Sequence, residues 1–153
     1  MTAFLIVVLS LCACTSVPKG CTIEGAVKDK SYEGKQVYLR HTLTPETYDS
    51  TIVKNGTFRF ALGETSPGVS LLVLKASSDD LFPITLPVAT EKGTVKVSLG
   101  ELVFTSGTAL NDKLQDFLLA VDRFSDEMGK KGENQEKIRK DFSSLLESSI
   151  LQN

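Results

Sequence analysis

Three cysteines and one histidine are the side chains of this sequence best suited to nucleophilic, redox or metal-binding chemistry. Cys12 and Cys14 lie close together near the N-terminus, Cys21 follows, and His41 stands alone. A zinc site usually takes about three or four nitrogen or sulfur ligands, and thiol–disulfide exchange needs an attacking and a resolving cysteine. The sequence provides neither set, so we expect no metal, no cofactor and no catalysis. An enzyme with Cys21 as nucleophile is the distant alternative.

Adjacent carboxylates occur at two places, and paired carboxylates can serve as general acid and base. Asp79-Asp80 falls in an expected turn, and Asp126-Glu127 falls on the polar side of an expected helix end. Both pairs fit solvated surface positions. The glycine-rich phosphate and dinucleotide loops, the H-E-x-x-H zinc motif and the G-x-S-x-G elbow do not occur in the sequence. A non-catalytic chain is therefore expected.

The N-terminal segment carries the clearest functional signal. Phe4 to Ala13 is an uncharged apolar run, and the segment ends Leu11-Cys12-Ala13-Cys14. The run has about ten residues, whereas a membrane-spanning helix needs about 20, so it predicts an export signal. A small residue before a cysteine is typical of the end of bacterial lipoprotein signals. We expect residues 1–13 to be the signal peptide, Cys14 to be the lipidated N-terminus, and residues 14–20 to form a tether.

This interpretation places the protein in the bacterial cell envelope, anchored in the membrane through its N-terminal lipid, at the periplasmic face of the outer membrane. Cys12 is the poorer lipid acceptor because the bulky Leu11 precedes it. No lysine or arginine precedes Phe4, although export signals normally carry basic residues there. A start further upstream and a buried N-terminal strand are the alternatives.

Composition sets limits on partners and on stability. Hydrophobic residues make up 41% and charged residues 24% of the chain, close to the globular average, so we expect a packed core. The formal net charge of −2 gives no basic surface for nucleic acid. If Cys14 carries lipid, Cys21 has no cysteine partner, and the core must form without a disulfide framework.

Residues 21–105 alternate apolar and polar side chains with a period of two and are interrupted by turn residues, as strands do. Pro83 and Pro87 each remove a backbone donor, so the segment 81–88 is expected at a sheet edge. The fold class is mainly β: an antiparallel β-sandwich of about seven or eight short strands over residues 21–105, followed by a C-terminal α-helical hairpin over residues 106–153.

The strongest local turn signal is Asn55-Gly56. Two such residues between strand segments predict a type I′ hairpin, because both positions need a positive φ. Lys54 is then expected opposite Thr57, and the segments 48–54 and 57–62 are expected to pair along their length.

The C-terminal segment changes to a helical period. One apolar stripe runs from Leu110 to Met128 and a second from Ile138 to Ile150, with Thr108 as the expected N-cap and Gly129 just beyond the end of the first helix. We expect the stripes to pack on each other and partly on the sandwich, leaving a residual apolar strip. The candidate interaction surface comprises Phe117, Val121, Phe124, Phe142 and Leu146.

Four segments behind the lipoprotein-type leader are together similar to a known family: Cys21-Thr22-Ile23-Glu24-Gly25, Gly34-Lys35-Gln36-Val37-Tyr38-Leu39, Tyr48-Asp49-Ser50-Thr51 and Asn55-Gly56-Thr57-Phe58-Arg59-Phe60. They resemble the β-sandwich module of unknown function at the N-terminus of envelope thioredoxin-like disulfide reductases (the TlpA/AhpC-like group). Ser106 to Asp112 resembles that family's entry into a helical segment. The resemblance implies a catalytic C-x-x-C domain beyond residue 153, so no catalytic residue carries over.

Two functions follow from these observations. The first is a lipid-anchored interaction or positioning module, whose partner is a thioredoxin-like protein, another envelope protein or a second copy. The alternative is a truncated fragment of a thiol–disulfide oxidoreductase. An in-frame continuation beyond Asn153 into a C-x-x-C sequence would favour the alternative.

Overall fold

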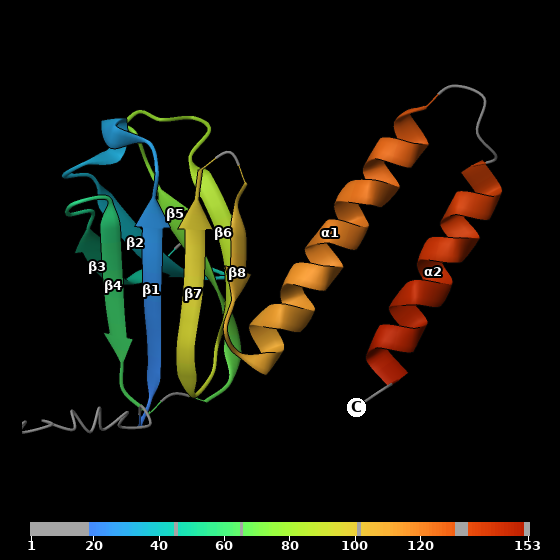
Figure 1. Cartoon of the computed structure of the whole chain (residues 1–153), viewed down its shortest axis with the longest axis horizontal. Coiled ribbons are helices and arrows are strands. Elements are labelled where there is room, and N and C mark those ends of the chain that lie inside the picture. Colours follow the sequence, from blue (N-terminus) through green and yellow to red (C-terminus); the bar gives the residue numbers. More distant parts are fainter. Residues whose placement is uncertain (1–18, 45, 65, 101, 131–134, 152–153) are drawn as a thin grey trace, which may run out of the picture.

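Eight strands form two four-stranded sheets that face each other, and two helices follow them in the chain (Figure 1). The computed structural model describes residues 19–44, 46–64, 66–100, 102–130 and 135–151. The strands are β1 (Cys21–Val27), β2 (Gln36–His41), β3 (Thr47–Ile52), β4 (Thr57–Leu62), β5 (Gly68–Leu74), β6 (Ile84–Thr90), β7 (Gly93–Leu99) and β8 (Phe104–Ser106). A short 3-10 helix, η1 (Lys30–Tyr32), precedes β2, and α1 (Ala109–Gly129) and α2 (Gln135–Leu151) complete the chain order. The predicted class, mainly β with a terminal helical hairpin, is confirmed.

The strand order defines four edges. The first sheet has the order β4-β1-β7-β8 and the second the order β3-β2-β5-β6. Neighbouring strands are antiparallel except for β1 and β7, which are parallel, so the expected antiparallel arrangement is wrong for this pair. In each sheet the two outer strands have one unpaired side, so β4, β8, β3 and β6 are the edge strands of the described sandwich.

The core lies between the two sheets and follows the predicted alternation. On β1, Cys21, Ile23 and Val27 are buried while Glu24 and Ala26 are exposed. The largest fully buried apolar side chains come from both sheets and are Ile23, Leu39, Leu72, Leu74, Leu99, Val37, Val53, Val88 and Val95. At about 1.5–3 kcal/mol for each large apolar side chain removed from water, this layer is the main source of stability in the sandwich.

The Asn55-Gly56 turn forms as predicted, but the strands on either side of it separate. Asn55 and Gly56 have φ values of 53° and 68°, and Lys54 and Thr57 exchange backbone hydrogen bonds of 2.8 and 3.0 Å. The expected pairing along the whole length is wrong, because β3 pairs with β2 while β4 pairs with β1. The hairpin connects the two sheets instead of extending one of them.

The edge position expected for the segment 81–88 is confirmed, since β6 is the last strand of its sheet. The strand begins only at Ile84, because the Asp80 carboxylate accepts hydrogen bonds from the backbone N–H groups of Ala76 and Phe82. This carboxylate holds the preceding residues in a loop. Phe82, at 90% exposure, therefore projects into solvent.

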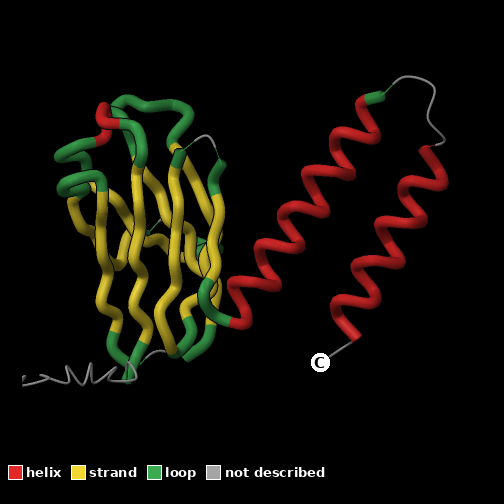
Figure 2. The backbone as a smooth tube through the Cα atoms, in the orientation of Figure 1, coloured by secondary structure: helices red, strands yellow, loops and turns green. Residues whose placement is uncertain are grey.

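The helices extend from the β8 edge of the sandwich (Figure 2). Thr108 is the N-cap residue of α1, as expected, with an extended backbone. Gly129 was expected beyond the end of the helix, but it is the last helical residue, and Lys130 is the C-cap residue. Among the described elements α2 has its main contacts with α1. Its outer side therefore faces away from the sandwich.

Candidate functional site

The cysteine and histidine side chains are not brought together. Cys21 is buried at the start of β1, and burial raises the pKa of its thiol, which disfavours the reactive thiolate. His41 is exposed at the end of β2, with its ring 4.7 Å from the ring of Tyr48. Within the described residues no group of three or more His, Cys, Asp or Glu side chains lies close enough to hold a metal ion. Cys12 and Cys14 lie outside the described residues.

The adjacent carboxylates occupy surface positions. Asp79, Asp126 and Glu127 are exposed. Asp80 has its pKa held below the ordinary value, because its carboxylate accepts the backbone N–H groups of Ala76 and Phe82. The role of Asp80 that the geometry supports is to fix a loop.

A single amide side chain closes the edge of β6. Asn111, in the first turn of α1, is completely buried. Its oxygen accepts the backbone N–H of Ala89 at 2.9 Å, and its nitrogen donates to the Ala89 carbonyl at 2.8 Å. The carboxamide thus makes the two bonds with Ala89 that a further strand would make. Asn111 also accepts from the Thr105 hydroxyl of β8 and donates to Thr108 Oγ1, so it ties α1 to both sheets.

The edge of β8 is closed one helical turn further along α1. The backbone N–H of Thr105 donates to Gln115 Oε1 at 2.9 Å. Exposed edge donors invite pairing with another chain, and Pro87 of β6 has no donor to offer. Together Asn111, Gln115 and Pro87 block this side of the sandwich. Within the described residues every buried side-chain polar atom has a partner.

An apolar strip of α1, called here the α1 stripe, lies between the side of the helix that contacts the sandwich and the seam with α2. The α1 stripe consists of Leu110, Leu114, Phe117, Val121 and Met128. Asn111 and Leu118 face the sandwich, while Ala120 and Phe124 line the seam with α2. At about 3.6 residues per turn the middle of the α1 stripe lies roughly a quarter turn from each contact, with Leu114 nearer Leu118 and Phe117 nearer Phe124. Leu110 and Phe117 are each 42% exposed, whereas Leu114, Val121 and Met128 are half-buried, so this strip is partly open to solvent.

The structure separates the five residues of the predicted interaction surface. Phe124 and Phe142 stack on each other with ring centroids 4.5 Å apart and join the two helices. Phe117 and Val121 lie on the α1 stripe, which is beside that seam around the helix. The side chain of Leu146 lies outside the described residues. The surface therefore divides into a helix–helix contact and an exposed strip.

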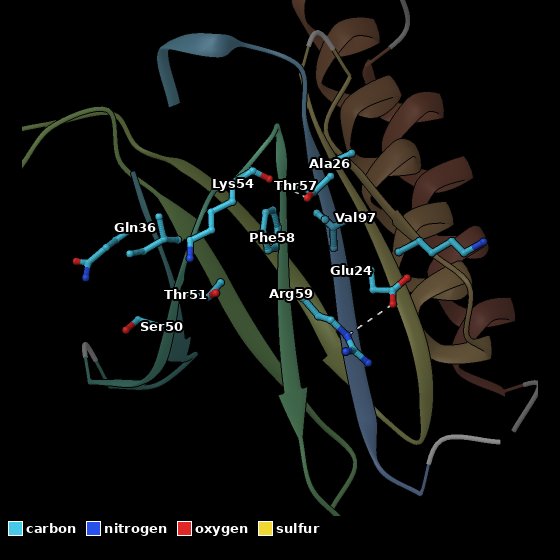
Figure 3. Close-up of a pocket in the computed structure, with 13 residues that line it drawn as sticks. Glu24, Ala26, Gln36, Ser50, Thr51, Lys54, Thr57, Phe58, Arg59 and Val97 are labelled. Carbon is cyan, nitrogen blue, oxygen red and sulfur yellow. Dashed lines mark hydrogen bonds and ion pairs between the residues drawn. The ribbon is translucent and has the colours of Figure 1, made fainter. Parts of the chain in front are cut away.

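A second surface lies on the opposite side of the sandwich, between β4 and β3. Figure 3 shows a hollow with Gln36, Ser50 and Thr51 on one side, Arg59 and Glu24 on the other, and Phe58 between them. Its volume is about 860 Å³. Arg59 and Glu24 form an exposed ion pair at 3.7 Å, which is worth little in water. Sequence reasoning missed this hollow because it forms only where the two edge strands separate.

These features define the class of protein, a small two-sheet β-sandwich whose closed side is held by a C-terminal helix. Residues 21–114 match the family described as a domain of unknown function, DUF4369, and the chain belongs to this family. The match begins at the first residue of β1 and ends in α1, so it includes Asn111. No curated protein matches the chain. In the described part of the chain, no helix has the length and apolar character needed to cross a membrane.

Proposed function

We propose that the chain is a non-catalytic, lipid-anchored module of the bacterial cell envelope that positions a partner protein through the α1 stripe. The observation that carries this proposal is the partly exposed apolar strip on a helix that is itself firmly fixed to both sheets. An exposed contiguous apolar strip is typical of a protein–protein contact. Fixation by Asn111 holds the strip in one orientation before the partner arrives.

The position of the start of β1 is compatible with an anchor at Cys14. Gly20 accepts the backbone N–H of Gly93 at 3.1 Å, and a side chain at Gly93 would lie 3.0 Å from Thr108. The start of β1 and the start of α1 therefore lie at the same end of the sandwich (Figure 1). A tether at Cys14 would hold that end near the membrane, and α1 would extend away from it. The proposed partner is the thioredoxin-like domain of an envelope disulfide reductase, which the sequence resemblance implies.

The anchor is tested by expressing the full chain in a Gram-negative host and measuring its intact mass. We expect cleavage before Cys14, a gain of acyl mass, and recovery in the membrane fraction. Cys14→Ala should release a folded domain, whereas the matched variant Cys12→Ala should stay attached. A product that keeps residues 1–13, or that is cleaved without gaining acyl mass, would refute the anchor.

The partner contact is tested by titrating a purified thioredoxin-like envelope reductase domain and following fluorescence anisotropy. Phe117→Asp on the α1 stripe should weaken binding. Leu119→Asp provides the matched control, because Leu119 is 50% exposed on the other side of the same helix and next to β8. Equal affinity for the two variants, or no binding by the unaltered chain, would contradict the proposal.

A further inference from the structure

We propose that the free edge of β4 binds an extended polypeptide segment by strand addition, and that this segment alternates apolar and acidic side chains. This site lies on the side of the sandwich away from α1, so it is independent of the α1 stripe and of the function proposed above.

The first step is the direction of the backbone groups of β4. Thr57 exchanges two hydrogen bonds with Lys54 and so points its N–H and C=O away from β1. Val27, on the other side, donates to the carbonyl of Gly56. Because backbone groups alternate along an antiparallel strand, Arg59 and Ala61 also direct their N–H and C=O away from β1. In the described residues no strand pairs with β4 on that side.

The second step is the comparison with the other three edges. Ala89 of β6 is capped by Asn111, and Thr105 of β8 by Gln115. On β3, the backbone N–H of Ser50 donates to the Asp49 carboxylate at 2.8 Å, and the pairing with β2 shifts register between Leu39 and Arg40. Such devices keep edges from pairing with other chains. On β4 the outward groups of Thr57 are taken by Lys54, but within the described residues Arg59 and Ala61 have no such cap, and the register with β1 is regular.

The third step is the chemistry of the surroundings. The hollow of about 860 Å³ next to β4 provides room for one more strand. Side chains of an added strand opposite Phe58 and Phe60 would point toward the core, which favours apolar residues. Those opposite Arg59 would point outward, where Lys54 and Lys96 also line the hollow and Glu24 is its one acidic lining residue. Acidic side chains therefore complement the outer face.

The same charges disfavour a second copy as the occupant. Pairing of two β4 edges would bring Arg59 and Lys54 of both copies to one seam, and like charges across strands are destabilising. A separate acidic segment avoids this repulsion.

The test uses two blocked heptapeptides, one alternating valine with glutamate and one alternating valine with lysine. We expect the full chain to bind the glutamate peptide more tightly in fluorescence anisotropy, and the amides of Arg59 and Ala61 to gain protection from hydrogen exchange. Ala61→Pro removes one outward donor without removing a bond to β1, and should weaken binding by about tenfold. Ala61→Ser keeps the donor and should bind like the unaltered chain.

Arg59→Glu keeps the test decisive if the proline variant fails to fold, because it should reverse the preference toward the lysine peptide. Equal binding of both peptides, or unchanged affinity in a folded Ala61→Pro variant, would overturn the proposal. Sedimentation that shows self-association lost in Ala61→Pro, with no peptide binding, would also overturn it by identifying a second copy as the occupant.

Discussion

The two sides of the sandwich treat their edge strands in opposite ways. On one side, α1 places Asn111 and Gln115 against β6 and β8, and their amides take up edge groups of both strands. On the other side, β3 and β4 separate after the Asn55-Gly56 turn, and a hollow lies between them. The comparison shows that the first turns of α1 are part of the sandwich's packing, whereas the β4 edge is available to another chain.

Among changes on the side closed by α1, removal of the Asn111 amide should cause the largest loss in the free energy of unfolding. Asn111→Ala leaves the backbone groups of Ala89 and the Thr105 hydroxyl buried without a partner. Unsatisfied buried groups cost about 1–3 kcal/mol each, so we expect a loss of roughly 3–5 kcal/mol in the free energy of unfolding, measured in urea. The exposed turn variant Asn55→Gly should change it by less than about 0.5 kcal/mol, because glycine also adopts a positive φ. A loss under about 1 kcal/mol for Asn111→Ala would show that α1 does not hold the closed side.

Substitutions between the two helices should lower the free energy of unfolding by a smaller amount. Phe142 is half-buried and stacks on Phe124, so Phe142→Ala should cost about 1–2.5 kcal/mol, below the roughly 3–5 kcal/mol of a fully buried phenylalanine. Phe117→Ala should cost less than about 1 kcal/mol, because its side chain is 42% exposed. Thermal unfolding of both variants measures the difference. An equal large cost for both would mean that Phe117 is buried in solution, for example in a self-associated form.

Removal of the side chain that caps the β8 edge should lower the free energy of unfolding by less than Asn111→Ala or Phe142→Ala. Gln115→Ala removes the acceptor of the Thr105 N–H and should cost about 1 kcal/mol. The neighbouring exposed variant Asp116→Ala should stay within about 0.5 kcal/mol of the unaltered chain. Amide exchange at Thr105 provides the direct measurement, and unchanged protection in Gln115→Ala would contradict the assigned role.

The smallest expected effect on stability concerns the Asn55-Gly56 turn, which lies beside the hollow between β3 and β4. The Glu33 carboxylate accepts the backbone N–H groups of Asn55 at 2.8 Å and Gly56 at 3.0 Å, and these bonds lower its pKa. The stabilisation is present above the pKa of the unfolded chain and is lost as the pH falls through the lowered folded value. An NMR titration should show the Asn55 and Gly56 amide shifts following that lowered pKa, and Glu33→Gln should remove the titration. An ordinary Glu33 pKa would contradict this contact.

The alternation of apolar and polar residues predicted the strands, because burial of one face of a strand requires an apolar side chain at every second position. β1 shows this pattern with Ile23 inside and Glu24 outside. Pro87 located an edge because a missing donor is visible in the sequence. The separation of β3 from β4 was not predictable from the turn, since Asn55-Gly56 specifies only the residues next to it. Asn111 and Gln115 were missed because their partners are backbone groups of Ala89 and Thr105, which side-chain patterns do not reveal.

The parallel pairing of β1 with β7 has a consequence for how the chain acquires its structure. β1 lies between β4 and β7, so its sheet is incomplete until β7 has formed, and five strands separate β1 from β7 in the sequence. Contacts between distant segments close late and slow folding, because the entropy of the intervening loop is lost first. During synthesis β1 and β4 can pair early, whereas Ile23 of β1 gains its partner Val95 only when β7 is complete. The interval before β7 emerges is the period in which the chain is most exposed to aggregation and to proteases.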